Sequence, residues 1–268
     1  MQRDTWDPAQ YQRFRAEREQ PFWDLAGLLR VSAPELLIDL GCGTGELTVA
    51  LHQHVQARRT VGVDSSKAML QRARSLEAPG VSFVEADIAE WTPDEPADVV
   101  FSNAALQWVP GHEKLLPRIA GYVASSGELA VQVPANFDHP SHTIAADVAR
   151  EEPFAAALGG HVRTPPVLRP EEYALLLHSI GFGAQHVRLQ VYTHELPSSA
   201  DVVEWTRGTL LTDYQSRMPH SLFESFVEEY ERRVVTELGG AAPYVYAFKR
   251  ILLWGSRQEP GQISSLST

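Results

Sequence analysis

The chain contains one cysteine among 268 residues, Cys42, so it cannot form an intrachain disulfide. It also lacks an apolar run of the ~20 residues that a membrane-spanning helix requires. Residues 1–8 are charged and include no apolar stretch, which predicts that the chain carries no signal peptide. Together these absences favour a cytoplasmic protein built on a hydrophobic core, and hydrophobic residues supply 44% of the chain.

Positive charge is also scarce, because 23 lysine and arginine residues face 34 acidic residues and the net charge is −11. This balance argues against a nucleic-acid partner, whose binding depends on clustered basic side chains. It still allows a small anionic substrate, since a few arginines in a pocket can reverse the potential locally. His52 and His54 would lie on different faces of one helix, so the sequence predicts no metal site there.

Apolar segments that end at glycine, proline or acidic residues alternate with segments of helical periodicity. This alternation predicts an α/β fold, with a mostly parallel sheet of seven strands and helices on both faces. The predicted strands cover residues 36–40, 60–64, 81–85, 98–102, 128–133, 184–192 and 244–254. The predicted helices between them cover residues 44–54, 66–76, 112–123 and 170–179.

Two segments interrupt the alternation, namely 135–166 and 197–240, and the second is predicted to form two helices. Residues 6–30 are predicted to form two short helices that are broken at Pro21. We expect residues 1–30, 135–166 and 197–240 to form a helical lid over the carboxyl edge of the sheet, where open α/β sheets bind ligands. The expected organisation is one domain over 1–258 and a flexible tail over 259–268.

The first predicted strand runs directly into three glycines at alternate positions, Gly41, Gly43 and Gly45. A turn without side chains, at the start of a helix, exposes backbone N–H groups to a ligand. The spacing differs from the dinucleotide fingerprint G-x-G-x-x-G, because Glu46 stands where that motif has its third glycine. Asp39, just before the glycines, would repel a pyrophosphate and suits a cationic or hydroxyl-bearing ligand.

Acidic residues also end the next two predicted strands, at Asp64 and Asp87. A carboxylate at the end of the second strand, about 20 residues beyond the glycines, can accept hydrogen bonds from both ribose hydroxyls. Asp87 could accept the exocyclic amine of an adenine, with Ile88 packed on the ring. The other interpretation of Asp64, as the N-cap of the helix that starts near Ser66, stays open.

The segment Asp39 to Gly45, together with Asp64 and Asp87, resembles the class I S-adenosylmethionine-dependent methyltransferases. Residues 102–112 (SNAALQWVPGH), 131–137 (VQVPANF) and 6–8 (WDP) are similar to the trans-aconitate methyltransferases within that superfamily. Two departures are evident. Thr44 stands where the family commonly has proline, and residues 155–169 match the family poorly.

The resemblance implies a Rossmann-like fold and S-adenosylmethionine as methyl donor, with S-adenosylhomocysteine as product. It places the glycine turn at the methionine part of the donor, Asp39 at its amino group and Asn103 beside the sulfonium. The implied cofactor-binding residues are Tyr11, Phe14, Asp39, Gly41, Gly43, Asp64, Ser65, Met69, Asp87, Ile88, Asn103 and Leu106.

The implied reaction is esterification of a carboxylate on a small polycarboxylic acid, with trans-aconitate favoured. Carboxyl groups with a pKa near ~4 are already ionised at neutral pH, so no catalytic base is required. A polycarboxylate needs cationic or hydrogen-bonding partners, of which arginine is the best suited. The candidates for positioning this substrate are Arg18, His142, Arg163, Tyr192, Trp205 and Arg250, and His112, Tyr173 and His194 could line the same pocket.

Four alternatives remain open at this point. The same cofactor could serve another small-molecule acceptor, such as a natural-product hydroxyl, amine or carbon, and such acceptors usually need a base. A nucleic-acid methyltransferase is disfavoured by the charge and by Ala104 after Asn103. The third alternative is a protein that binds the cofactor without catalysis, and the fourth is a nicotinamide dehydrogenase. A monomer or weak homo-oligomer is expected.

Overall fold

The computed structural model describes the backbone of residues 15–258 and the side chains from Glu19 onward. The expectations for Tyr11, Phe14, the Arg18 side chain and the tail at 259–268 lie outside this part of the chain. The chain forms two compact units. We call them the sheet unit (residues 15–134, 166–190 and 250–258) and the helical unit (residues 135–165 and 191–249).

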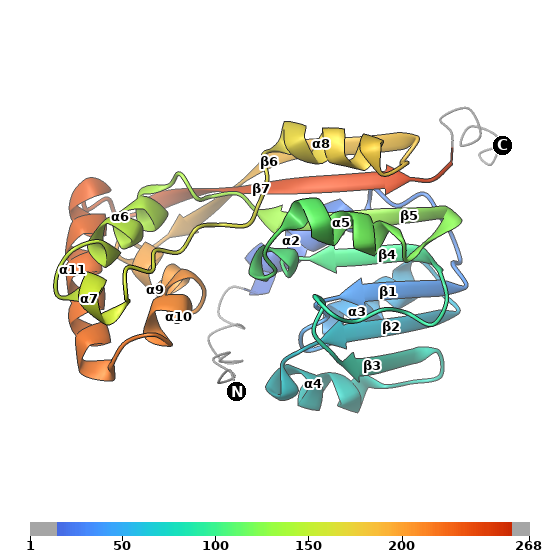
Figure 1. The fold of residues 1–268 in the computed structure, drawn as a ribbon, viewed down its shortest axis with the longest axis horizontal. Coiled ribbons are helices and arrows are strands. Elements are labelled where there is room, and N and C mark those ends of the chain that lie inside the picture. The colour runs from blue at the N-terminus through green and yellow to red at the C-terminus, as the bar shows by residue number, and fades with distance from the viewer. Residues whose placement is uncertain (1–14, 259–268) are drawn as a thin grey trace. The chain divides into compact units, whose positions relative to one another are not determined.

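The sheet contains seven strands in the order β3-β2-β1-β4-β5-β7-β6 (Figure 1). Strands β1 to β5 pair in parallel, and β7 pairs antiparallel to β5. The order reverses between β1 and β4, and ligands bind at such a switch point in open α/β sheets. The bounds are β1 Leu36–Leu40, β2 Arg59–Asp64, β3 Val81–Glu85, β4 Ala97–Asn103, β5 Val123–Pro134, β6 Ala184–Leu196 and β7 Tyr244–Ser256.

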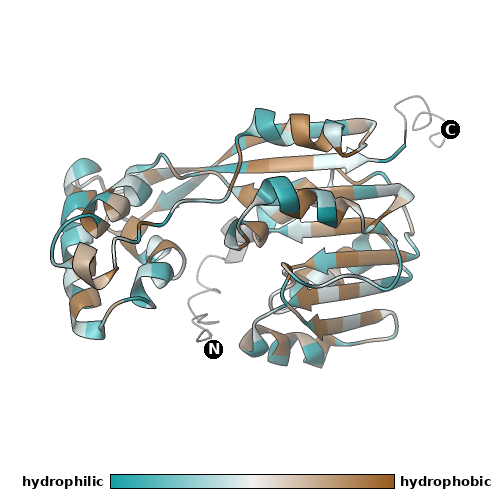
Figure 2. Ribbon diagram, in the orientation of Figure 1, coloured by the Kyte–Doolittle hydropathy of each residue, from teal (hydrophilic) through white to brown (hydrophobic). Residues whose placement is uncertain are grey.

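Helices cover both faces of the sheet, as expected for right-handed connections between parallel strands. Figure 1 shows α5 and α8 in front of the sheet and α3 behind it. The hydrophobic residues follow the strands, where Figure 2 is mostly brown, because strands covered on both faces are apolar throughout. The helices of this unit are α2 Arg15–Ala26, α3 Glu46–His54, α4 Lys67–Ala73, α5 His112–Ala120 and α8 Pro170–Ser179, with 3₁₀ turns at η1 Arg74–Leu76 and η2 Leu106–Trp108.

The α/β fold class and all seven strands are confirmed, but the expected break at Pro21 is wrong. Helix α2 continues through Pro21, which is buried. Phe22 and Leu25 are almost completely buried, and the Phe22 ring lies 5.0 Å from that of Phe101 on β4. We attribute the continuous helix to this packing, which offsets the cost of about 3 kcal/mol that proline imposes inside a helix.

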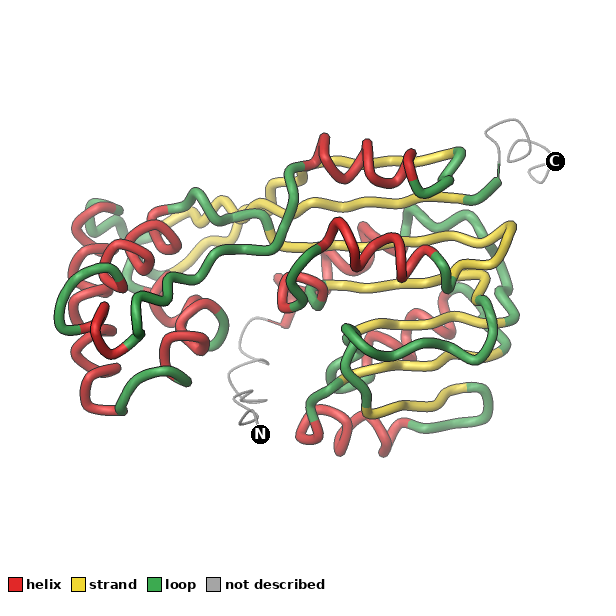
Figure 3. The backbone as a smooth tube through the Cα atoms, in the orientation of Figure 1, coloured by secondary structure: helices red, strands yellow, loops and turns green. Residues whose placement is uncertain are grey.

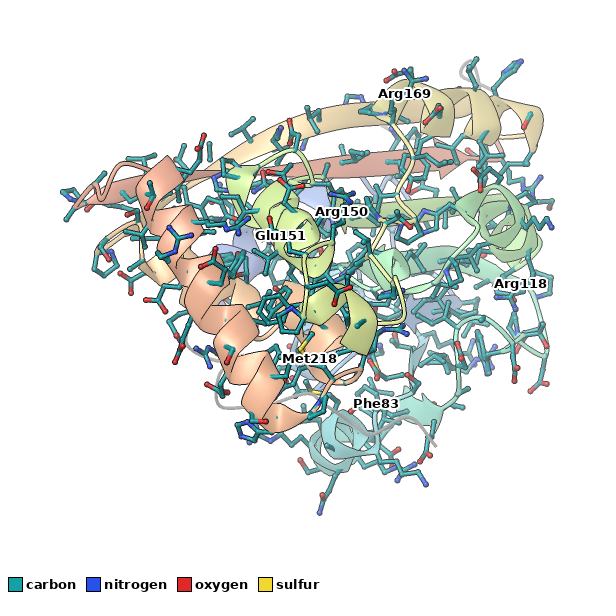
Figure 4. All side chains as sticks on the ribbon, turned by 60° about the vertical axis from the view of Figure 1, so that its left-hand side comes forward. Phe83, Arg118, Arg150, Glu151, Arg169 and Met218 are labelled. Atoms are coloured by element: carbon teal, nitrogen blue, oxygen red, sulfur yellow. The ribbon has the colours of Figure 1, made fainter. Side chains whose placement is uncertain are left out.

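The helical unit is built around a second hydrophobic core. Its cluster includes Phe226 and Tyr230 of α11, Val148 of α6, Trp205 of α9 and Met218, which is labelled in Figure 4. The helices are α6 Pro140–Ala149, α7 Phe154–Ala157, α9 Asp201–Arg207, α10 Leu210–Gln215 and α11 His220–Glu237.

Residues 197–240 therefore form three helices, not the expected two, and loops separate them in Figure 3. The sequence pattern missed the division because α9 and α10 are short, and Gly208 and Thr209 interrupt them. Helix α11 is tied to the end of α6 by Arg233, whose guanidinium forms a bidentate ion pair with Glu151, labelled in Figure 4. The expectation that residues 1–30, 135–166 and 197–240 form a lid over the sheet stays a prediction.

None of the helices over the described stretch 15–258 is both long enough and apolar enough to cross a membrane.

Candidate functional site

The turn after β1 depends on glycine for two different reasons. Gly41, Gly43 and Gly45 have φ values of 83°, 55° and 82°, in the left-handed region that favours glycine. A Cβ on Gly41 would lie 2.1 Å from the Cβ of Ala105, so packing also excludes a side chain there. At Gly43 no described atom lies within 4 Å of a Cβ position, so the backbone of this residue is approachable from outside.

The carboxylate of Asp64 holds this turn in place. Its Oδ2 accepts a hydrogen bond from the Gly43 N–H at 2.9 Å, and its Oδ1 accepts one from the Ser66 N–H at 2.8 Å. The N-cap of α4 is Ser66, whose hydroxyl accepts from the Met69 N–H, so the capping interpretation of Asp64 is wrong. Asp64 is half-buried and links the glycine turn to the end of β2.

Asp39 is only 3% exposed, although it carries an ionisable carboxyl group. The Thr48 hydroxyl donates a hydrogen bond of 2.6 Å to its Oδ2. Burial raises the pKa of Asp39 from 3.8 to about 7; the Thr48 hydrogen bond opposes this rise and the nearby charge of Asp64 adds to it. Asp39 is therefore close to half-protonated at neutral pH, and an incoming cation would favour its ionised form.

The loop after β3 presents Asp87, which is exposed, and Ile88, which is half-buried. The Asp87 Oδ1 accepts from the Ala89 N–H at 2.7 Å, which turns the loop back on itself. Arg118 of α5, labelled in Figure 4, donates to the carbonyl oxygens of Ile88 and Trp91. The sequence interpretation missed Arg118 as a support of this loop, because nothing in the pattern of α5 connects it with residues far away in the chain.

The end of β4 carries Asn103 and leads into the turn that contains Leu106. Leu106 is completely buried, and its carbonyl oxygen accepts from the Nε2–H of His112 at 2.9 Å. Since this bond places the proton of a neutral ring on Nε2, the His112 Nδ1 accepts from the Tyr173 hydroxyl at 2.5 Å. Burial lowers the pKa of His112, in agreement with a neutral ring. His112 and Tyr173 therefore support the turn, and both are 1% exposed.

The structure brings most of the predicted cofactor-binding residues to one edge of the sheet. Neighbouring strands end together there, with Leu40 beside Val63, Asp64 beside Glu85 and Asn103 beside Gln132. Met69 differs from the others because it is 5% exposed and lies within α4. The residues gathered at or next to these strand ends are Asp39, Gly41, Gly43, Asp64, Ser65, Asp87, Ile88, Asn103 and Leu106.

Four of the predicted substrate residues lie in the helical unit. His142 of α6 shares a hydrogen bond of 3.1 Å with the Ser141 hydroxyl. Burial lowers the pKa of His142 to about 3, and the nearby charge of Arg163 lowers it further, so the ring is neutral. The Arg163 guanidinium donates to the carbonyl oxygen of Leu210 at 3.3 Å. His142 and Arg163 are thus close enough to interact electrostatically.

The other two, Trp205 and Tyr192, are buried. The Trp205 ring stacks on His194 with centroids 5.0 Å apart, and it meets Tyr246 edge-on at 5.7 Å. The Tyr246 hydroxyl in turn lies 3.4 Å from the Ser141 hydroxyl. Aromatic packing and a buried hydrogen-bond network therefore connect Trp205 with the α6 segment that carries His142.

Arg250 belongs to the sheet unit, where it is 5% exposed and donates from Nη1 to the Gln132 Oε1 at 3.3 Å. No cluster of three or more possible metal ligands occurs within residues 15–258. His52 is engaged with Thr60 at 2.8 Å, and His54 contacts the ring of Trp23.

Known proteins resemble this chain both in sequence and in fold. A family model of methyltransferase domains matches residues 37–127. A trans-aconitate 2-methyltransferase from Deinococcus radiodurans is 39% identical over 261 residues, which cover 95% of this chain and 99% of the relative. One from Variovorax paradoxus is 40% identical over 85% of this chain and 88% of its own length. The solved YcgJ protein from Bacillus subtilis shares the fold, with a TM-score of 0.56 at 17% identity over 90% of this chain and 99% of its own.

The raised pKa of Asp39 predicts how stability depends on pH. The folded chain holds a proton on Asp39 that the unfolded chain releases above its ordinary pKa of 3.8. The free energy of unfolding should therefore fall as pH rises from about 4 to about 7, with a slope of up to about 1.4 kcal/mol per pH unit from this group. Denaturant titrations of the protein and of Asp39→Asn, which cannot ionise, measure the difference. Parallel pH profiles for the two proteins would contradict the assignment.

Proposed function

The chain belongs to the trans-aconitate 2-methyltransferase family, and from this membership we propose that it transfers a methyl group from S-adenosylmethionine to a carboxylate of trans-aconitate. Its reaction class is that of an S-adenosylmethionine-dependent methyltransferase with a Rossmann-like fold. The observation that carries the proposal is the approachable glycine turn, with carboxylates at the ends of β1 and β2 and just beyond β3.

The residues at this edge fit the methyl donor better than a dinucleotide. Asp39 would form an ion pair with the amino group of the donor, and its carboxylate would repel a pyrophosphate. Asp64, at the end of β2, would accept from the ribose hydroxyls. Asp87 and Ile88 would meet the adenine, on a loop that Arg118 holds in place.

The reaction requires the protein mainly to position the carboxylate next to the methyl group of the donor. The donor supplies an electrophilic methyl group on a positively charged sulfur. A carboxylate is already a nucleophile at neutral pH, so the side chains align it with the methyl group and remove its water. The neutral His142 agrees with this requirement, because it can donate or accept a hydrogen bond without adding charge.

The acceptor proposed is anionic, and its carboxylates would bind to cationic and polar side chains. Arg250 in the sheet unit and Arg163 with His142 in the helical unit are the described candidates, and Arg18 is a further one. We propose that the enzyme is a monomer or weak homo-oligomer and that it is cytoplasmic. The family relationship supports a small-molecule acceptor.

A panel of di- and tricarboxylic acids tests the acceptor. With S-adenosylmethionine, trans-aconitate should give a monomethyl ester at a higher kcat/KM than cis-aconitate, citrate or succinate. Mass spectrometry of the product identifies the ester, and release of S-adenosylhomocysteine gives the rate. An equal panel of phenols and amines is the control. Methylation of a phenol or an amine, with no ester from any acid, would refute the proposed acceptor class.

Two glycine substitutions separate ligand binding from folding. Gly43→Ala should leave the fold intact at a strain of roughly 1 kcal/mol, because its methyl group meets no described atom. That methyl group would occupy the ligand side of the turn, so the dissociation constant for S-adenosylhomocysteine should rise at least ~10-fold by calorimetry. Gly41→Ala should destabilise the fold by roughly 1–3 kcal/mol, because it clashes with Ala105.

Gly159→Ala is the matched control for the backbone strain. Gly159 has a φ of 59°, close to the 55° of Gly43, and it too has no described atom within 4 Å of a Cβ position. This variant should bind S-adenosylhomocysteine as the unmodified protein does. Unchanged binding by Gly43→Ala would exclude the turn from the cofactor site.

A further inference from the structure

The side chain of Gln132 is a polar group in the buried part of β5, where the only other polar side chain of residues 127–133 is Glu128. Residues 127–133 of β5 are all buried, and Gln132 is 0% exposed. It faces Asn103 across the parallel pairing with β4 and Leu252 across the antiparallel pairing with β7. A buried glutamine at this place should be fully hydrogen-bonded, because leaving a buried polar group unpaired costs ~1–3 kcal/mol.

Only half of the Gln132 amide is satisfied within the described chain. Its Oε1 accepts from the Arg250 Nη1 at 3.3 Å. Because a guanidinium can only donate, this contact fixes the oxygen towards Arg250 and the Nε2 away from it. The Nε2 is buried and has no hydrogen-bond partner among the described residues. Glu128, on the same strand, is also buried, and its carboxylate is hydrogen-bonded. It accepts from the Arg30 N–H and from the indole N–H of Trp254.

A complementary group lies on the neighbouring strand. The Oδ1 of Asn103, the register partner of Gln132, is also buried without a partner over residues 15–258. An unpaired donor and an unpaired acceptor therefore stand on adjacent strands, ~4.8 Å apart at the backbone, and do not bond to each other. Both residues lie at or near the carboxyl ends of their strands.

We propose that Gln132 is a substrate-binding residue, whose Nε2–H donates to one oxygen of the carboxylate that is methylated, while Asn103 Oδ1 faces the electropositive methyl group. The inference rests on the proposed function and assigns two further contacts to it. A carboxylate accepts hydrogen bonds only, so the donor side of the Gln132 amide suits it. Arg250 strengthens that donor by polarising the amide through its oxygen, and it adds a positive charge nearby.

The reaction step balances without any other group. The second oxygen of the held carboxylate forms a bond to the methyl carbon, and the bond between carbon and sulfur breaks. Its electron pair stays on sulfur, so the sulfonium becomes a neutral thioether and the carboxylate becomes a neutral ester. No proton moves, and one carboxylate oxygen stays bound to Gln132 throughout the displacement. The Gln132 donor thus orients the acceptor for in-line attack.

Gln132→Glu distinguishes this role from a purely structural one. If Gln132 only held Arg250, glutamate would do so better, since it gives Arg250 a charged acceptor. If Gln132 donates to the substrate, glutamate replaces the donor with an anion that repels a carboxylate. The KM for trans-aconitate should then rise ~10–100-fold, while the dissociation constant for S-adenosylhomocysteine stays within about twofold.

Gln185→Glu, on the exposed surface of β6, is the matched control for the change in charge, and it should leave both constants unchanged. Gln132→Met is a second variant of similar length that lacks the donor and suits a buried site. It should raise the KM for the acid as well, with cofactor binding preserved as evidence that the site is folded. Calorimetric titration of trans-aconitate into protein saturated with S-adenosylhomocysteine should show the same losses without turnover.

An unchanged acid KM and unchanged acid binding in either folded variant would overturn the role of Gln132. That result is distinct from failure of the proposed function, in which the unmodified protein esterifies no acid at all. A loss of acid binding equal to the loss of cofactor binding would also overturn the proposal, because it would mark Gln132 as a general support of the fold.

Discussion

The hydrogen bonds that Asp64 accepts from the N–H groups of Gly43 and Ser66 are the constraint on which the glycine turn depends. These bonds hold the glycine turn, which has few side chains of its own, against the end of β2. Gly43 keeps an open side, so a ligand can approach the backbone of this turn. The N–H groups of Gly41, Cys42, Gly43 and Gly45 already donate within the protein, to Val63, Asp64 and Cys42. One carboxylate thus fixes both the glycine turn and the start of the segment that leads into α4.

The ionisable groups among the candidate residues differ in burial and therefore in charge. Asp39 pairs with Thr48 inside the sheet unit and keeps its proton until about neutral pH, so it is ready to ionise when a cation arrives. Asp87 lies on an exposed loop, and the positioning of that loop depends on Arg118. In the helical unit, burial keeps His142 neutral. The net negative charge of the chain is compatible with the proposed acidic substrate, because the described residues proposed to bind it, Arg163, Arg250 and His142, are cationic or neutral.

The sequence predicted β1, β2 and β3 to within one residue, because each is a short strand that ends at an acidic residue or directly before a glycine. It also predicted which strand ends meet, since parallel strands end at one edge. It failed at Pro21, where packing of Phe22 on Phe101 outweighs the local preference of proline. It failed again at the division between α9 and α10, and it could not find the role of Arg118, which depends on contacts far apart in the chain. Gln132 did carry a signal, as a polar residue between Val131 and Val133, but its neighbours Arg250 and Asn103 become evident only in three dimensions.

The most direct test of the cofactor site is the nuclear magnetic resonance signal of the Gly43 amide during titration with S-adenosylhomocysteine. Binding should shift the Gly43 signal strongly until the site is saturated, while the signals of Gly159 and Gly160, which also have positive φ, stay in place. A ligand that binds and leaves the Gly43 amide unshifted would contradict the assignment of this turn as the cofactor site.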